Sequence, residues 1–150
     1  MVKAGEVAPV FTLTSDEGKA VSLEEFRGHK VVLYFYPKAD TPGCTQQACA
    51  LRDAYAPITE KDVVVIGISP DRPEALVKFR KKHDLPFILL SDPDHAVAEA
   101  YGVWGEKKLA GVAYQGITRS HFAIDEEGRL IEADLKVKPL TTADLALKLV

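Results

Sequence analysis

The stretch VVLYFYPKADTPGCTQQAC covers residues 31–49 and combines an unbroken apolar run, a loop rich in proline and glycine, and a helix-like segment. An apolar run without polar interruptions is typical of a strand that is covered on both faces. A second such run, DVVVIGIS, follows at 62–69. The two runs therefore predict central strands of a sheet with helices on its faces.

Shorter patterns outside these runs predict the rest of the fold. The segments 11–14 and 19–22 flank the turn-rich SDEG and predict an N-terminal hairpin, while an EEG turn predicts another hairpin within 121–135. Helices are expected at 45–55, 72–83, 94–101 and from 141 onward, and a further strand at 87–92. The alternation predicts an α/β fold with a mixed β-sheet flanked by helices.

Length and composition limit the kind of molecule. A chain of 150 residues that is 47% hydrophobic can bury a substantial core, so one domain over 1–150 is expected. The 19 basic and 22 acidic residues are spread along the chain without a basic stripe, which predicts no nucleic-acid partner. No secretory signal and no apolar run of about 20 residues is found, so we expect a soluble, cytoplasmic protein without membrane contact.

The only two cysteines, Cys44 and Cys49, lie in the segment that follows the first apolar run. Open α/β sheets place their functional sites at the carboxyl ends of central strands, and this segment is such a place. Cys44 falls in the first turn of the expected helix. The unpaired N–H groups and the helix dipole favour an anion there, so this position favours the thiolate form of a cysteine.

The spacing of the two cysteines predicts a reversible switch rather than a structural disulfide. Helix geometry puts the Cα atoms of Cys44 and Cys49 about 8.6 Å apart, whereas a disulfide requires roughly 7 Å or less. The two thiols can therefore join only if the helix unwinds. Two alternatives stay open for the residues taken singly: a cysteine can act as a small buried hydrophobe, or it can bind metal. A metal site is not predicted, because the histidines are scattered at His29, His83, His95 and His121.

The segment FYPKADTPGCTQQACALRD, residues 35–53, resembles the peroxiredoxins, and among them the Q-type group that is also called bacterioferritin comigratory protein. The pattern Pro-x-x-x-Thr-x-x-Cys falls on Pro37, Thr41 and Cys44. The similarity extends over nearly the whole chain. It implies a thioredoxin-like α/β fold with an N-terminal β-hairpin extension and no bound cofactor.

The resemblance also implies a mechanism. Cys44 matches the cysteine whose thiolate attacks a hydroperoxide and becomes a sulfenic acid. Thr41 matches the threonine that hydrogen-bonds the thiolate and the peroxide, and Pro37 matches the proline that shields the pocket from water. Arg119, in GITRSHF, matches the arginine that fixes the thiolate and polarises the substrate. Cys49 matches a resolving cysteine that forms a disulfide with Cys44, which thioredoxin then reduces.

Several points stay open at this stage. Gln46 and Gln47 stand where family members often carry glutamate, and His121 where they often carry a small hydroxyl residue. Both monomers and weak dimers fit the resemblance. A thioredoxin-type thiol–disulfide oxidoreductase is the alternative within redox chemistry, although it would normally carry C-x-x-C. A non-catalytic binding or chaperone-like module would lack one of Pro37, Thr41, Cys44 and Arg119, and none of them is missing.

Overall fold

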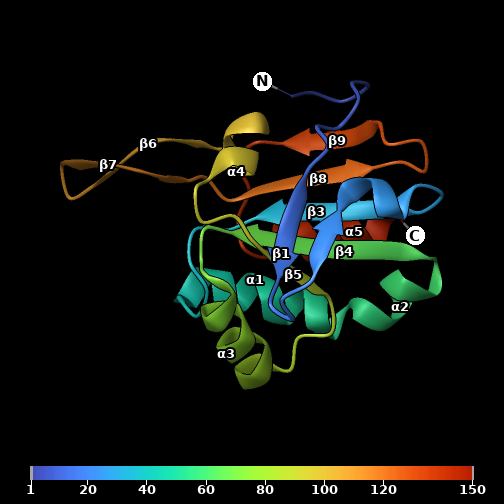
Figure 1. The fold of residues 1–150 in the computed structure, drawn as a ribbon, viewed down its shortest axis with the longest axis horizontal. Coiled ribbons are helices and arrows are strands. Elements are labelled where there is room, and N and C mark those ends of the chain that lie inside the picture. The colour runs from blue at the N-terminus through green and yellow to red at the C-terminus, as the bar shows by residue number, and fades with distance from the viewer. Residues whose placement is uncertain (1, 150) are drawn as a thin grey trace.

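A mixed sheet forms the centre of the fold, as the sequence predicts (Figure 1). The structure is a computed structural model of the chain and describes residues 2–149. The sheet has seven strands in the order β2-β1-β5-β4-β3-β8-β9. These strands are β1 Thr12–Ser15, β2 Ala20–Ser22, β3 Lys30–Phe35, β4 Val63–Ser69, β5 Ile88–Ser91, β8 Ser120–Ile124 and β9 Leu130–Asp134. The neighbours β3, β4 and β5 run parallel, and the hairpins β1–β2 and β8–β9 are antiparallel.

The central strand β3 is buried on both faces, which explains its unbroken apolar sequence. Alternate side chains of a strand point to opposite faces. Leu33 and Phe35 accordingly belong to one hydrophobic cluster, whereas Tyr34 and Tyr36 belong to the other. Cys44 belongs to this second cluster, so its side chain packs on the same face of the sheet as Tyr34 and Tyr36.

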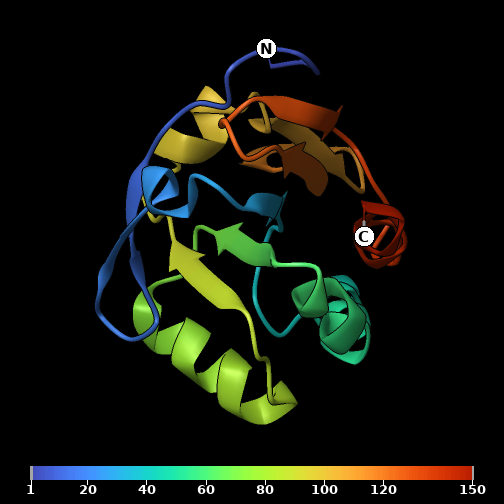
Figure 2. The same ribbon diagram turned by 90° about the vertical axis from the view of Figure 1, so that its right-hand side faces the viewer.

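Helices cover both faces of the sheet unequally. The second cluster includes side chains from α1 Pro42–Asp53, α2 Tyr55–Glu60, α3 Pro73–His83 and α5 Thr141–Leu149, so these four helices share one face. The other face is covered by the short α4 Ala96–Ala100, the 3-10 turn η1 Leu23–Phe26 and the N-terminal segment. Helix α5 lies beside α1 and α2 (Figure 2). Within residues 2–149 no helix is both long and apolar enough to cross a membrane.

The structure corrects the expected helix at 45–55 and adds a hairpin. Helix α1 already begins at Pro42 and ends at Asp53, and a separate helix α2 follows directly. The strands β6 Trp104–Leu109 and β7 Val112–Ile117, which the sequence pattern did not predict, form their own two-stranded sheet that projects from the body (Figure 1). Most of their side chains are exposed, so the hairpin lacks the apolar alternation that marks a half-buried strand.

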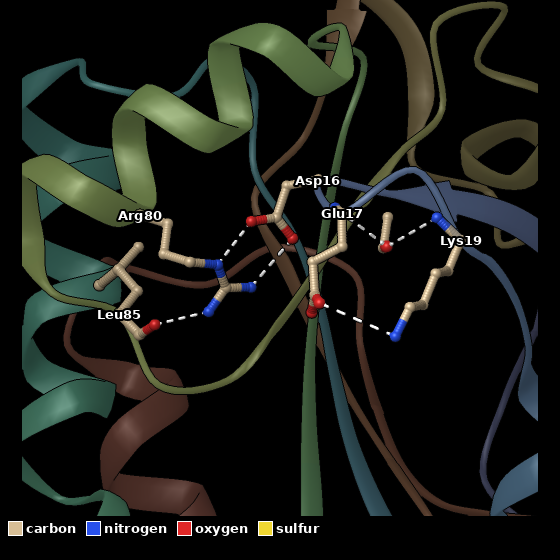
Figure 3. Close-up of polar contacts among 6 residues, drawn as sticks. Asp16, Glu17, Lys19, Arg80 and Leu85 are labelled. Carbon is tan, nitrogen blue, oxygen red and sulfur yellow. Dashed lines mark hydrogen bonds and ion pairs between the residues drawn. The ribbon is translucent and has the colours of Figure 1, made fainter.

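An ion pair connects the N-terminal hairpin to α3. The Arg80 guanidinium donates to both carboxylate oxygens of Asp16, with Nη2 to Oδ1 at 3.0 Å, and its Nη1 donates to the Leu85 carbonyl at 2.6 Å (Figure 3). The Asp16 side chain is only 4% exposed. Because a buried carboxylate requires a partner, this contact holds the hairpin against the helix layer.

Candidate active site

Cys44 lies where the sequence predicts it, in the first turn of a helix that follows the central strand. The chain leaves β3, passes through the loop at 36–41 and enters α1 with Thr41 as the N-cap residue and Pro42 in the first turn. Proline suits this position because its fixed φ matches the helix and its missing N–H is not needed there. The Cys44 side chain is buried, and its thiol is free.

Arg119 is brought to Cys44 by the pairing of two strands that are far apart in sequence. Strands β3 and β8 are antiparallel, with Phe35 opposite Ser120, so the residue before Ser120 lies at the carboxyl end of β3. Arg119 Nη2 donates to Cys44 Sγ at 3.4 Å. A Cβ atom on Gly43 would lie 2.9 Å from the same Nη2, so a larger residue at this position would require the guanidinium to shift.

Gln47 and Thr142 complete a buried network that the sequence did not reveal. Arg119 Nη1 donates to Gln47 Oε1 at 2.6 Å, and Gln47 Nε2 donates to Thr142 Oγ1 at 2.9 Å. Both Gln47 and Thr142 are fully buried. Gln47 comes three residues after Cys44 and so lies on the same face of α1, a spacing that could have identified it. Nothing in the sequence pointed to Thr142 on α5.

Thr41 and Pro37 lie in the loop between β3 and α1. The Thr41 hydroxyl donates to the Lys38 carbonyl at 2.7 Å and makes no capping bond to the helix. Its proton is therefore engaged, while the lone pairs of its oxygen stay available to accept a hydrogen bond. Pro37 is half-buried and lies two residues beyond the end of β3 at Phe35. The structure thus places both residues on the path into α1, with the Thr41 hydroxyl donating to Lys38.

Cys49 is half-buried on the same continuous helix, and the two cysteines are not bonded. Since α1 is helical from Pro42 to Asp53, the estimate of about 8.6 Å between their Cα atoms applies to this state. The structure therefore corresponds to the reduced form, in which a disulfide cannot close.

Two buried tyrosines belong to the same hydrophobic cluster as Cys44. Tyr34 and Tyr36 stack with ring centroids 5.4 Å apart, and burial raises the pKa of both phenols well above the ordinary value. His121, which pairs with Tyr34 across β3 and β8, is fully buried and hydrogen-bonds Glu132 at 3.3 Å. Burial lowers the pKa of His121, so it is neutral near pH 7. His121 is therefore a core residue.

Comparisons with known proteins show which family this chain belongs to. The family model of the AhpC/TSA family matches residues 4–133. Peroxiredoxin Bcp of Bacillus subtilis is 50% identical over 137 residues, covering 91% of this chain and 87% of the relative. Peroxiredoxin Bcp of Escherichia coli is 51% identical over 129 residues, covering 86% of this chain and 83% of the relative.

Solved structures give the same result. A cysteine-to-serine variant of Xanthomonas campestris peroxiredoxin Q superposes with a TM-score of 0.90 at 32% identity, covering 99% of this chain and 97% of the other. The bacterioferritin comigratory protein of the same organism, studied for alkyl peroxide reduction, superposes with a TM-score of 0.86 at 32% identity, covering 93% and 88%.

The chain therefore belongs to the AhpC/TSA family. Within it, the similarity to Bcp and Q proteins makes it a peroxiredoxin of that group, a thiol-dependent peroxidase with a thioredoxin-like fold. The resemblance stated from the motif around Cys44 is confirmed.

Proposed function

We propose that this chain is a single peroxiredoxin domain that reduces hydrogen peroxide and organic hydroperoxides through Cys44. The observation that carries the proposal is the Arg119 Nη2 contact with Cys44 Sγ at 3.4 Å, at the start of a helix. A cation and a helix N-terminus both stabilise a thiolate. The alkyl peroxide reduction studied in the Xanthomonas campestris relative supports organic hydroperoxides as substrates.

The first step is attack of the Cys44 thiolate on one peroxide oxygen. The S–O bond forms as the O–O bond breaks, the sulfur is oxidised to a sulfenic acid, and the leaving oxygen takes a proton and departs as water or an alcohol. A guanidinium has five N–H donors, and Arg119 uses one on Cys44 and one on Gln47. Others remain for the oxygen on which negative charge develops.

Thr41 and Pro37 have supporting roles in this proposal. The Thr41 oxygen, whose own proton goes to Lys38, accepts the O–H of the bound peroxide and so orients it toward the sulfur. The half-buried Pro37 shields the thiolate from water. Both roles depend on the loop at 36–41 that joins β3 to α1.

The second step is attack of the Cys49 thiolate on the Cys44 sulfenic acid, which releases water and forms an intramolecular disulfide. The separation of about 8.6 Å between the Cα atoms requires α1 to unwind locally first. A dithiol protein of thioredoxin type then reduces the disulfide. We place the protein in the cytoplasm, where such reductants keep thiols reduced, as a monomer or weak dimer.

Intact-mass and peptide-map analysis of the reduced protein after one equivalent of hydrogen peroxide tests this function. We expect the loss of two hydrogens, located to a bond between Cys44 and Cys49. Cys44→Ser should abolish peroxide consumption. Cys49→Ser should consume about one equivalent and then stall with an oxidised Cys44.

Two results would contradict the proposal. Continued peroxide reduction by Cys44→Ser would exclude Cys44 as the attacking group, and full thioredoxin-dependent turnover by Cys49→Ser would exclude Cys49 as the resolving group. Efficient disulfide exchange without peroxide reduction would instead favour the alternative of a thioredoxin-type oxidoreductase.

A further inference from the structure

A cavity of about 400 Å³ adjoins Arg119 at the base of the projecting β6–β7 hairpin. Its charged lining comes from three separate parts of the chain: the hairpin, the residue before β8 and the segment after β9. We call it the basic cavity, and its charged residues are Glu106, Lys107, Lys108, Arg119 and Lys136. Four cations thus face one carboxylate, in a chain whose formal net charge is −3.

The cations of the basic cavity outnumber the one carboxylate that lines it. Among residues 2–149, no salt bridge involves Lys107, Lys108, Lys136 or Arg119. The Lys107 ammonium donates to the Ile117 carbonyl at 2.7 Å, which fixes the group in place without cancelling its charge. Four positive charges held near a single carboxylate create a net positive potential that attracts anions.

Arg119 connects this cavity to the reacting sulfur. The guanidinium lines the cavity and also donates to Cys44 Sγ at 3.4 Å. Burial lowers the pKa of Lys107, and so does the charge of Arg119, whereas a charge on Cys44 raises it. The Lys107 ammonium therefore lies within range of the charge on Arg119 and of a charge on Cys44, so the cavity and the thiol share one electrostatic environment.

We propose that the basic cavity binds the carboxylate of a small hydroperoxide that carries one, with the peroxide group of the same molecule at Cys44. The proposal rests on the proposed peroxidase role of Cys44 and Arg119, and it specifies which substrates that site prefers. The carboxylate takes no part in the chemistry, since the O–O bond breaks and the sulfur is oxidised as for any hydroperoxide. Because one side chain belongs to both places, the carboxylate and the peroxide must be close in the substrate.

A matched pair of substrates tests the preference directly. β-Hydroperoxyisovalerate is anionic at pH 7, and its methyl ester carries the same peroxide without the charge. We would measure the second-order rate constant of the reduced protein with each compound, following Trp104 fluorescence by stopped flow at low salt, with hydrogen peroxide as reference. The carboxylate should react about tenfold faster than the ester, in the range expected for electrostatic steering. The ratio should fall as salt is added.

Charge variants assign this ratio to the cavity. The double variant Lys108→Gln and Lys136→Gln, at two exposed positions, should bring the carboxylate-to-ester ratio close to one. Glu106→Gln removes the one negative charge of the basic cavity and should raise the carboxylate-to-ester ratio. Lys61→Gln is the control, because Lys61 is exposed, precedes β4 and lies at the opposite end of the parallel strands from Cys44.

Each failure has a distinct meaning. A ratio near one in the unmodified protein, or a ratio that the double variant leaves unchanged, would overturn the proposed preference while hydrogen peroxide still reacts. If hydrogen peroxide itself fails to react, the proposed function is wrong instead. Free isovalerate should slow the reaction of the carboxylate substrate alone. If it slows all three peroxides equally, the cavity binds free anions at Arg119 and is not a substrate subsite.

Discussion

Thr142→Val should accelerate formation of the disulfide between Cys44 and Cys49, because it destabilises helix α1 in the reduced protein. Valine has nearly the shape of threonine but no hydroxyl, so Gln47 Nε2 loses its acceptor at 2.9 Å. Gln47 is fully buried, and an unsatisfied buried donor costs about 1–3 kcal/mol. This cost destabilises the protein with an intact helix α1. The unwound state is not destabilised in this way, because unwinding between Cys44 and Cys49 exposes the Gln47 side chain to water.

The magnitude follows from that difference. A cost of about 1–3 kcal/mol shifts the equilibrium between wound and unwound helix by roughly 5- to 150-fold. If unwinding limits resolution, disulfide formation should become at least several-fold faster in the variant. Faster resolution leaves less time for a second oxidation, so Cys44 should form less sulfinic acid at high peroxide.

Rapid-quench thiol alkylation with mass spectrometry measures both quantities. Ile124→Val is a matched control, because it removes one methylene from a buried position in β8 and costs about 1 kcal/mol without touching α1. It should lower the urea midpoint but leave the rate of disulfide formation unchanged. The reasoning is refuted if Thr142→Val lowers stability by a similar amount and resolution stays at the unmodified rate.

Three further predictions concern other parts of the structure. Arg119→Lys keeps the charge but loses the two-pronged guanidinium that contacts Cys44 and Gln47 together, so the second-order rate constant with hydrogen peroxide should fall about a hundredfold. An unchanged rate constant would show that the paired contacts of the guanidinium do not contribute to the reaction. Arg80→Met leaves the buried Asp16 carboxylate unpaired and should cost about 3 kcal/mol in urea unfolding, largely recovered when Asp16→Asn is added. Burial lowers the pKa of His121, so below about pH 6.5 the unfolded chain binds more protons than the folded chain. The free energy of unfolding therefore keeps the full contribution of neutral His121 above about pH 6.5 and declines as the pH falls below that value. His121→Met should flatten that decline in urea unfolding measured at pH 5 and pH 7, and a parallel pH profile would contradict it.

The sequence predicted the features that depend on local pattern. The unbroken apolar run at 31–37 identified β3, and the proline and glycine before Cys44 identified a helix start. The spacing from Cys44 to Cys49 gave a distance that the continuous α1 retains. The family resemblance then supplied Thr41 in the motif, and Arg119 in the separate segment GITRSHF, as candidates. The β6–β7 hairpin was not predicted, because an exposed ribbon held by backbone pairing imposes no apolar periodicity on its side chains.

Only the tertiary structure decided what surrounds the thiol. Arg119 reaches Cys44 because the antiparallel register of β3 and β8 places Ser120 opposite Phe35, and this register is a pairing between distant segments. Thr142 meets Gln47 because α5 packs on α1. Local patterns determine which segments become strands and helices, since propensity and periodicity act over neighbouring residues. Contacts between segments 70 or more residues apart depend on packing of the whole core, so no local pattern determines them.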